Sequence, residues 1–285
     1  APAMRARAFH HLMEQKAIWI GEGELIVGEK GPEPKATPTY PELCCHTLPD
    51  LDLLDSREKI PFRVSTEARA VYEKEIIPFW RGRAMRDHLI AAMTDEWRAA
   101  YGAGVFTEFM EQRAPGHTVL DDKIYRKGML DFKADIARAL AALDFELDPA
   151  ALDRREELEA MAIACDALVV FAERHAELAG RMAAEAADET RRAELERIAE
   201  VCRRVPAEAP RDLHEALQHY WFCHLAVITE LNGWDSFCPG HLDQHLWPFY
   251  RRGLADGSLT GASARELLEC FFVKFNNHPA PPKVG

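Results

Sequence analysis

Long hydrophobic runs are missing from the sequence. No stretch of about 18 apolar residues occurs in its 285 residues, so no membrane-spanning helix is expected. The first 15 residues are amphipathic and lack a central apolar region, which argues against a secretory signal. Basic residues are also scarce, with 35 Lys and Arg against 47 Asp and Glu, whereas a nucleic-acid-binding face must be basic. These absences predict a cytoplasmic globular protein that binds neither a membrane nor nucleic acid.

Paired cysteines and phosphate-binding loops are missing as well. Seven cysteines occur without a Cys-x-x-Cys pair, and Cys165 and Cys223 fall in apolar helical patterns, where a thiol acts as a small hydrophobic group. That usage is typical of a reducing compartment, and the adjacent Cys44 and Cys45 have no His or Cys partner set for zinc. The glycine-rich stretch GEGELIVGEKG is too acidic to cradle a phosphate.

Histidine spacing does not favour a metal site. His214, His219 and His224 follow one another at intervals of five residues, which misses the i,i+4 spacing that places two ligands on one helix face. We therefore expect no bound metal and no cofactor held by these residues.

The first 50 residues predict an arm that lies over a larger body. Apolar residues recur at helical spacing over 4–16, and those over 18–27 flank a Gly-Glu-Gly turn in a pattern that favours a short β-hairpin or two strand fragments. The proline-rich run over 31–42 should be extended, because each proline fixes its own φ and disfavours the α region for the residue before it.

From residue 51 onward the pattern is helical and no domain boundary is visible. A helix start is predicted at Ser65, and Pro78 is expected to bend or restart a helix. One further helix is expected over 85–102, ended by Gly102 and Gly104.

A long helical pair is predicted over 149–182 and 186–203. Its first member carries an apolar stripe at helical spacing, namely Leu158, Met161, Cys165, Leu168, Val169, Ala172, Leu178 and Met182. Asp212 and Ser263, each followed three residues later by Glu, both fit a helix N-cap.

The C-terminal third contains a long apolar helix that stops at Asn232-Gly233 and a last helix that ends in a proline-broken tail. The last helix carries Phe271, Phe272, Val273 and Phe275, which demand burial on most sides. We expect the chain to be part of a longer protein that supplies the covering layer.

Two stretches could carry chemistry, and the first lies in a turn. Arg113 and His117 are separated by Ala-Pro-Gly, so they sit at a helix end or turn rather than on a helix face. A guanidinium fork and an imidazole can together bind an anionic or hydroxylated ligand. An Arg that caps backbone carbonyls beside a buried His is the structural alternative.

The second stretch is the loop WDSFCPG, which follows the apolar helix. Ser236 could bind a ligand hydroxyl, and Trp234 and Phe237 could form an apolar wall. Cys238 lacks the partners of a catalytic triad, which favours a structural thiol. Asp243 and His245, in the next helix, fit capping or buried hydrogen-bonding groups better than catalytic ones.

Six segments, in order along most of the chain, match the pattern of one enzyme superfamily. They are IWIGEGELIVGEKGPEPKATPTYPE, EIIPFWRGR, RAPGHTVLDDKIYRKGMLDFK, CRRVPAEAPRDLHEALQHYWFCHL, SFCPGHLDQHLWPFY and KFNNHPAPPKVG. Together they resemble the N-terminal part of glycyl radical enzymes, the pyruvate formate-lyase-like superfamily. RAPGHT with KIYRKGMLDFK is more similar to the branch of diol dehydratases and sulfonate C–S lyases than to pyruvate formate-lyase itself.

The resemblance implies an α/β fold for the whole enzyme, a ten-stranded barrel of two half-barrels wrapped by helices. Residues 1–285 would supply one mainly α-helical N-terminal portion with a few short strands. Within it, residues 1–50 would be the arm and 51–285 the helical shell and first barrel strand. A homodimer and an anaerobic, cytoplasmic setting are implied too.

The resemblance also implies radical chemistry. In this family a radical SAM iron–sulfur activating enzyme places a radical on a glycine near the C-terminus, and the radical passes to a cysteine that is often followed two residues later by Glu. The resulting thiyl removes a hydrogen atom from the substrate. Neither the Cys-x-Glu segment nor the glycine motif occurs in these 285 residues. The catalytic residues are therefore expected beyond residue 285, and the chain alone should be inactive.

Several positions match substrate contacts of the family. Arg113 and His117 fall where relatives hold the polar or sulfonate group, and Ser236 falls where dehydratases hold a hydroxyl. Trp234 and Phe237 would line the pocket or pack at the barrel rim. In isethionate-cleaving relatives we expect Gln in place of His117, so the His favours 2,3-dihydroxypropane-1-sulfonate or a plain diol such as glycerol.

We therefore expect the full-length protein to eliminate sulfite or water from a small hydroxylated substrate, with isethionate kept as a further candidate. The two stretches that carry Arg113 and Ser236 should converge on one buried cavity. Two alternatives stay open. An arylacetate decarboxylase of the same superfamily should have fewer polar anchors, and a non-catalytic helical binding module should hide its apolar last helix.

Overall fold

The computed structural model describes residues 2–36, 39–58, 61–106, 117–118, 120–230 and 237–277. Over these residues the chain is mainly helical with two very short strands, as the sequence predicted. The first half contains α1 (Pro2–Gln15), α2 (Leu48–Ser56), α3 (Thr66–Val71), the π-helix η1 (Tyr72–Ile76), α4 (Ile77–Trp80), α5 (Met85–Ala92), α6 (Asp95–Gly102), β1 (His117–Thr118) and the 3-10 helix η2 (Asp121–Tyr125). The second half contains α7 (Met129–Ala141), α8 (Ala151–Glu185), α9 (Glu189–Arg204), α10 (Leu213–Glu230), β2 (Phe237–Cys238), α11 (Leu242–Asp256) and α12 (Gly261–Asn277).

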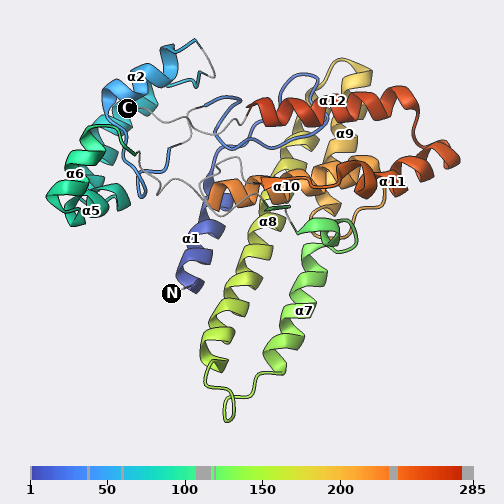
Figure 1. Cartoon of the computed structure of the whole chain (residues 1–285). Helices are drawn as coiled ribbons and strands as arrows, with labels where there is room; N and C mark the ends of the chain where they lie inside the picture. The colour runs from blue at the N-terminus through green and yellow to red at the C-terminus, as the bar shows by residue number, and fades with distance from the viewer. Residues whose placement is uncertain are drawn as a thin grey trace.

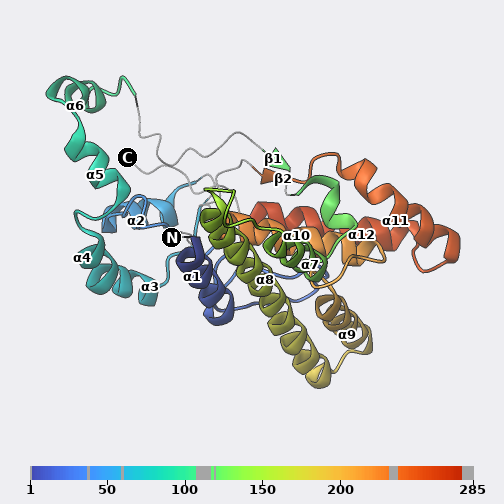
Figure 2. The same ribbon diagram turned by 90° about the horizontal axis from the view of Figure 1, so that it is seen from below.

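The helices form two lobes with separate hydrophobic cores, and Figures 1 and 2 both show one lobe beside the other. The small lobe contains α2–α6 and is built on Leu51, Leu54, Phe62 and Tyr72. The large lobe contains α1 and α7–α12, together with the segment 17–30. Within the described residues, no helix of either lobe is long and apolar enough to cross a membrane.

Helices α8 and α10 organise the large lobe. Helices α1, α7 and α9 pack along α8, and α10 lies with nearly all of its side chains buried. Trp221 and Phe222 of α10 are 0% and 1% exposed, and burial of each such side chain contributes about 1.5–3 kcal/mol. The predicted helical pair is confirmed as α8 and α9. Of the predicted apolar stripe, Met161 is 56% exposed and lines a pocket.

The prediction of a β-hairpin or strand fragments over residues 18–27 was wrong. The segment has a turn at 22–23 and bends at 25–26, and side chains of α10 bond to its backbone where a partner strand would. Gln218 bonds both to the Val27 nitrogen and to the Val27 oxygen, each at 2.8 Å, and Trp221 Nε1 donates to the Gly28 oxygen at 2.9 Å. Gly28 has φ +114, and a Cβ there would lie 2.8 Å from Leu225 Cδ1, so only glycine fits against the helix.

Helix α12 is also tied to this segment. Lys274, 1% exposed, donates to Glu29 Oε1 at 2.7 Å and to Glu24 Oε1 at 2.5 Å. Phe271 is fully buried, whereas Phe272 and Val273 are 56% and 54% exposed. Helix α12 packs one face on Tyr220 and Trp221 and leaves Phe272 and Val273 uncovered by the described residues, which agrees with the expectation that this chain supplies only part of the layer the helix needs.

The proline-rich run is not extended throughout. Residues 31–35 form turns and bends, and Lys35 takes a left-handed φ of 59°, so the prediction was wrong for this part. Ala36 then pairs with Arg63 through an isolated parallel bridge, which joins the run to the small lobe.

In the small lobe, helices begin at capping residues and at a proline. The Ser65 side chain accepts from the Ala68 nitrogen at the start of α3, and Pro78 lies in the first turn of α4, so both predictions are confirmed. The single helix predicted over 85–102 is two helices. Thr94 accepts from the Trp97 nitrogen, and this N-cap begins α6 anew.

The predicted caps of the large lobe have mixed outcomes. Asp212 Oδ1 accepts from the Glu215 nitrogen at 2.9 Å, which confirms the N-cap of α10. Ser263 is not a cap. It lies in the first turn of α12, where its nitrogen donates to Thr260 Oγ1 at 3.1 Å and its Oγ accepts from the Thr260 nitrogen at 3.0 Å. The helix therefore begins three residues earlier, at a reciprocal Thr–Ser pair.

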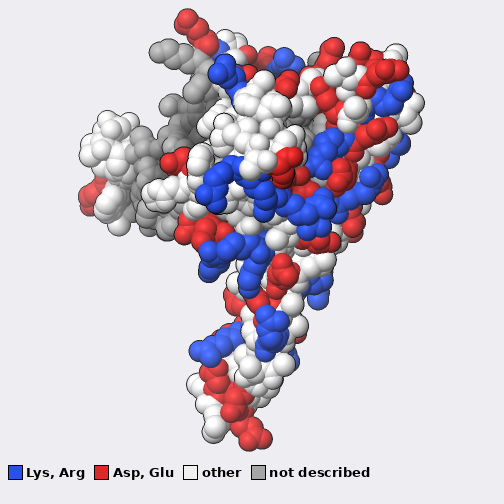
Figure 3. Space-filling view, turned by 90° about the vertical axis from the view of Figure 1, so that its right-hand side faces the viewer, with Lys and Arg blue, Asp and Glu red and all other residues white. Residues whose placement is uncertain are grey.

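Charges of both signs lie side by side on the face of the molecule seen in Figure 3, which lies at the right of Figure 1 where α9, α11 and α12 gather. Arg211 Nη2 bonds to Glu215 Oε1 at 2.7 Å, and Arg197 Nη1 pairs with Glu200 Oε2 at 2.7 Å. Both of these arginines are thus matched by carboxylates on the same face.

Candidate functional site

The two stretches singled out from the sequence meet at a short parallel ladder. Strand β1 pairs with β2, with His117 opposite Phe237 and Thr118 opposite Cys238. Figure 2 shows the two strands together between α10 and α11. The backbones of His117 and Phe237, two of the predicted substrate contacts, are thus brought side by side. Arg113, Trp234 and Ser236 lie outside the described residues, as do the side chains of His117 and Phe237 and the Asn232-Gly233 stop of the apolar helix.

A buried aromatic layer lies against the ladder. Helix α10 contacts both β2 and η2. Burial raises the pKa of Tyr220 above its ordinary value of 10.0, and the nearby Tyr125 and Cys238 raise it further. Its hydroxyl lies 3.1 Å from His224 Nδ1. Because burial also raises the pKa of Tyr125, both phenols stay protonated at neutral pH.

A polar contact joins the segment after β1 to the helix after β2. His245 Nε2 on α11 lies 3.5 Å from Asp121 Oδ1, and the His245 side chain is 11% exposed. The Tyr125 ring lies 5.2 Å from the His245 ring and 6.3 Å from the Phe249 ring. His245 was interpreted from the sequence as a capping or buried hydrogen-bonding group; its side chain is largely buried, but its Nδ1 has no hydrogen-bond partner among the described residues.

Sequence reasoning missed Asp121 and Tyr125. Both fall within the segment RAPGHTVLDDKIYRKGMLDFK, but no pattern along the chain links them to a histidine on a distant helix. The sequence marks them only locally, as an acidic pair that directly follows an apolar stretch and precedes an aromatic residue.

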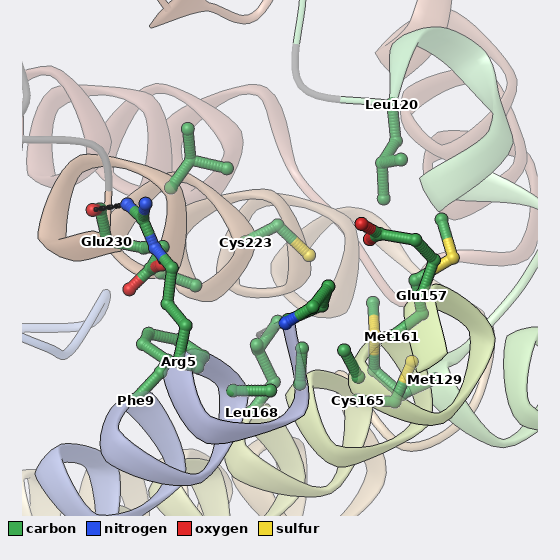
Figure 4. A pocket seen from close by; sticks show the side chains of 16 residues that line it. Arg5, Phe9, Leu120, Met129, Glu157, Met161, Cys165, Leu168, Cys223 and Glu230 are labelled. Carbon is green, nitrogen blue, oxygen red and sulfur yellow. Dashed lines mark hydrogen bonds and ion pairs between the residues drawn. The ribbon is translucent and has the colours of Figure 1, made fainter. Parts of the chain in front are cut away.

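An apolar pocket of about 560 Å³ lies between α1, α8 and α10 (Figure 4). Leu120, two residues after β1, forms part of its wall, so the pocket borders the ladder. Side chains from four helices complete it, namely Pro2, Arg5, Ala6, Phe9, Met129, Glu157, Ala160, Met161, Ala164, Cys165, Leu168, Cys223, Ala226, Val227 and Glu230.

The chemistry of this pocket suits an apolar group rather than a polyol. Its charged groups are Glu157 and the Arg5–Glu230 ion pair, which lie towards its edges in Figure 4. Burial raises the pKa of the Cys165 thiol to about 11 and raises that of Cys223 as well. Both sulfur atoms therefore remain uncharged, and the pocket offers few hydrogen bonds to a hydroxylated ligand.

The described residues do not fit the role of a radical carrier or a metal site. Cys165, Cys202 and Cys223 are buried within the helical core, and Cys238 on β2 is followed by Pro-Gly rather than by a Cys-x-Glu sequence. In the ranges that the structure describes, no three His, Cys, Asp or Glu side chains are grouped to hold a metal ion.

Comparison with known proteins shows the class. The family model "Pyruvate formate lyase-like" matches residues 1–285, so the chain belongs to this family, which the sequence pattern predicted. The fold agrees with that membership, because the structural neighbours are barrel enzymes of which the chain matches the helical N-terminal part.

Among individual relatives, trans-4-hydroxy-L-proline dehydratase of Clostridioides difficile is 57% identical over 284 residues, which is 100% of this chain and 36% of that protein. The crystal structure of that organism's hydroxyproline dehydratase with trans-4-hydroxy-L-proline bound matches 100% of this chain and 36% of the other, with a TM-score of 0.92. Isethionate sulfite-lyase of Nitratidesulfovibrio vulgaris is 34% identical over 282 residues, 95% of this chain and 34% of that protein. The chain thus spans about a third of the length of these relatives.

Proposed function

We propose that this chain is the N-terminal portion of a glycyl radical dehydratase, which eliminates water from a small hydroxylated substrate. The observation that carries this proposal is the 57% identity to a hydroxyproline dehydratase over the entire chain, against 34% to a sulfite-lyase. A cyclic hydroxylated amino acid such as trans-4-hydroxy-L-proline is therefore the first substrate to test. Glycerol and 1,2-propanediol follow, since dehydratases of these diols are also structural relatives at 30% identity.

The contribution of these residues would be to bind and orient the substrate. The β1–β2 ladder supports this role, because it joins the turn after Arg113 to the loop after Ser236. In this proposal Arg113 holds the carboxylate or other anionic end, and His117 and Ser236 hold hydroxyl groups. Trp234 and Phe237 would form the apolar wall that excludes water from the reacting carbon.

The radical chemistry would come from residues outside this chain. In the proposed full-length enzyme, this chemistry would remove a hydrogen atom from the carbon beside the C–O bond. The same hydrogen atom would later be returned to the product radical. The hydroxyl leaves with a proton as water, so substrate becomes product plus water and no oxidant is consumed. A radical SAM activating enzyme and a second copy of the protein are the partners that the proposal includes, in an anaerobic, cytoplasmic setting.

The test is an anaerobic assay of the activated full-length protein with trans-4-hydroxy-L-proline, glycerol and 1,2-propanediol supplied separately. We expect one of these three substrates to lose one molecule of water, which mass spectrometry detects. Ser236→Ala should lower kcat/KM about tenfold, because one hydrogen bond to the substrate is lost. The control Asp122→Asn changes an exposed carboxylate that pairs with Arg126 and should leave the rate unchanged.

Sulfite elimination is the second candidate, and the 34% identity to isethionate sulfite-lyase is the observation that favours it. Isethionate and 2,3-dihydroxypropane-1-sulfonate are therefore included in the assay, with free sulfite as the readout. Release of sulfite without any dehydration would replace the first proposal with this one. Consumption of hydroxyphenylacetate alone would support the arylacetate decarboxylase instead.

A further inference from the structure

The described part of the candidate site is a parallel ladder of only two residue pairs. An isolated pair of short strands is marginally stable at best, so this ladder cannot maintain its own register. The contacts that fix β1 against β2 must therefore come from neighbouring segments. Helix α10 contacts β2 and η2 from one side, and the segments that follow the two strands meet each other.

The meeting point of these segments is the contact between Asp121 and His245. Asp121 lies three residues after the end of β1, and His245 lies near the start of α11, which follows β2. Nε2 of the imidazole is 3.5 Å from Oδ1 of the carboxylate. The side chain of His245 is 11% exposed and that of Asp121 63%, so the contact joins a largely buried imidazole to a carboxylate that faces the solvent.

The second nitrogen of the His245 ring indicates that the contact with Asp121 sets the orientation of this ring. His245 Nδ1 is buried and has no hydrogen-bond partner among the described residues. A carboxylate facing Nε2 favours the tautomer with its proton on Nε2, an assignment made from geometry. Asp121 is thus the polar group that orients the ring, while Tyr125 packs against it at 5.2 Å. Removal of the carboxylate charge would leave the imidazole free to turn.

The backbone before this contact needs such support. Leu120 and Asp121 have φ values of 55° and 51°, both in the left-handed region. A non-glycine residue there costs about 1–3 kcal/mol, less for Asp than for Leu, and persists only where surrounding contacts over-determine it. The left-handed pair turns the chain directly after β1 and leads it into η2.

We propose that Asp121 and His245 form a positioning pair that sets the register of β1 against β2. The pair thereby fixes the backbones of His117 and Phe237, although neither Asp121 nor His245 need touch the substrate. The catalytic consequence rests on the proposed function, whereas the structural consequence does not. Two experiments separate them.

The first experiment measures hydrogen exchange in the full-length protein without any substrate. Asp121→Asn keeps the size of the side chain and its tolerance of left-handed backbone but removes the charge. Amides of peptides that cover 117–118 and 237–238 should exchange about tenfold faster in this variant, a shift typical of weakened local structure. In the matched control Asp122→Asn they should exchange as in the wild type. Unchanged exchange at both strands in Asp121→Asn would overturn the proposal.

The second experiment measures kinetics on whichever substrate the wild type consumes. Asp121→Asn and His245→Gln should each raise KM more than they lower kcat, with kcat/KM reduced about tenfold or more by the displaced contacts. The melting temperature should change little. Because both residues act through one contact, the double variant should be no worse than the poorer single variant. Strictly additive losses would refute the pairing, and a wild type inactive on every substrate would defeat the proposed function while leaving the exchange result standing.

Discussion

The two lobes are both helical, yet they are held together in different ways. The large lobe joins segments that are far apart in the sequence, as in the hydrogen bonds from Gln218 to Val27 and from Lys274 to Glu29. The small lobe depends on neighbours in sequence: a core of four residues, N-caps such as Ser65 and Thr94, and short helices. Its surface leaves Phe79, Trp97 and Val105 more than half exposed. The difference indicates that the small lobe opens at a lower free energy than the large one.

The largest expected change in the free energy of unfolding comes from replacing one tryptophan in each lobe. Trp221→Ala, in α10, removes a side chain that is 0% exposed and that donates a hydrogen bond to the Gly28 oxygen. The free energy of unfolding should fall by about 3–5 kcal/mol. Trp97→Ala, in the small lobe, removes a side chain that is 58% exposed and should cost less than about 1 kcal/mol. Chemical denaturation measures both, and equal losses would remove the distinction between the lobes.

An ion pair in each lobe gives the next comparison. Lys274→Met leaves the Glu29 carboxylate buried without its ammonium partner, and should cost about 3 kcal/mol. The added change Glu29→Gln should recover part of this loss, because it removes the buried charge. Arg69→Met breaks the exposed pair with Asp52 in the small lobe and should cost less than about 1 kcal/mol. A small loss for Lys274→Met would mean that the bonds to α10 hold residues 17–30 without help from this ion pair.

Acid should destabilise the large lobe through its buried histidines. Burial lowers the pKa of His175 from 6.5 to about 3, and His219 shows the same lowering. Between these pH values the unfolded chain binds protons that the folded one excludes. Each group therefore removes about 1.4 kcal/mol of stability for every pH unit below 6.5.

A variant tests this origin of acid sensitivity. His175→Asn can still donate to the Phe171 oxygen, and it should make the loss of stability from pH 6.5 to 4 shallower by about one proton. His88→Asn, on the exposed surface of the small lobe, should leave the slope as it is. An unchanged slope in His175→Asn would show that the acid sensitivity arises elsewhere.

The smallest expected change in stability comes from removing one helix N-cap in each lobe. Thr94→Ala and Thr260→Ala each remove one side-chain cap, which is worth about 1 kcal/mol. In the large lobe the loss should appear in the global melting temperature. In the small lobe it should appear mainly as faster amide exchange over 95–102, since that lobe opens separately. A shift of the global transition by Thr94→Ala would join the two lobes into one cooperative unit.

Helix positions and family could be predicted from the sequence, because capping residues and apolar spacing act locally. Ser65, Pro78 and Asp212 each did what their chemistry predicts. In the arm, the helix over 4–16 was predicted and is present as α1, but the course of residues 17–30 was not, because their apolar alternation is typical of a strand while their hydrogen-bond partners lie on α10. The same limit applies to the candidate site. Residue types pointed to the two stretches that form the ladder, but only tertiary packing brings Asp121 to His245.

The bonds between residues 17–30 and α10 have a consequence for biosynthesis. The hydrogen bond of Val27 cannot form until Gln218, 191 residues later in the chain, has been synthesised. At about 5–20 residues per second a ribosome needs roughly 10–40 s to make that interval, and further time before α12 emerges. During this delay the nascent arm carries Ile20, Ile26 and Val27 without the helices that will shelter them. It is therefore a segment on which a ribosome-associated chaperone or protease can act during synthesis.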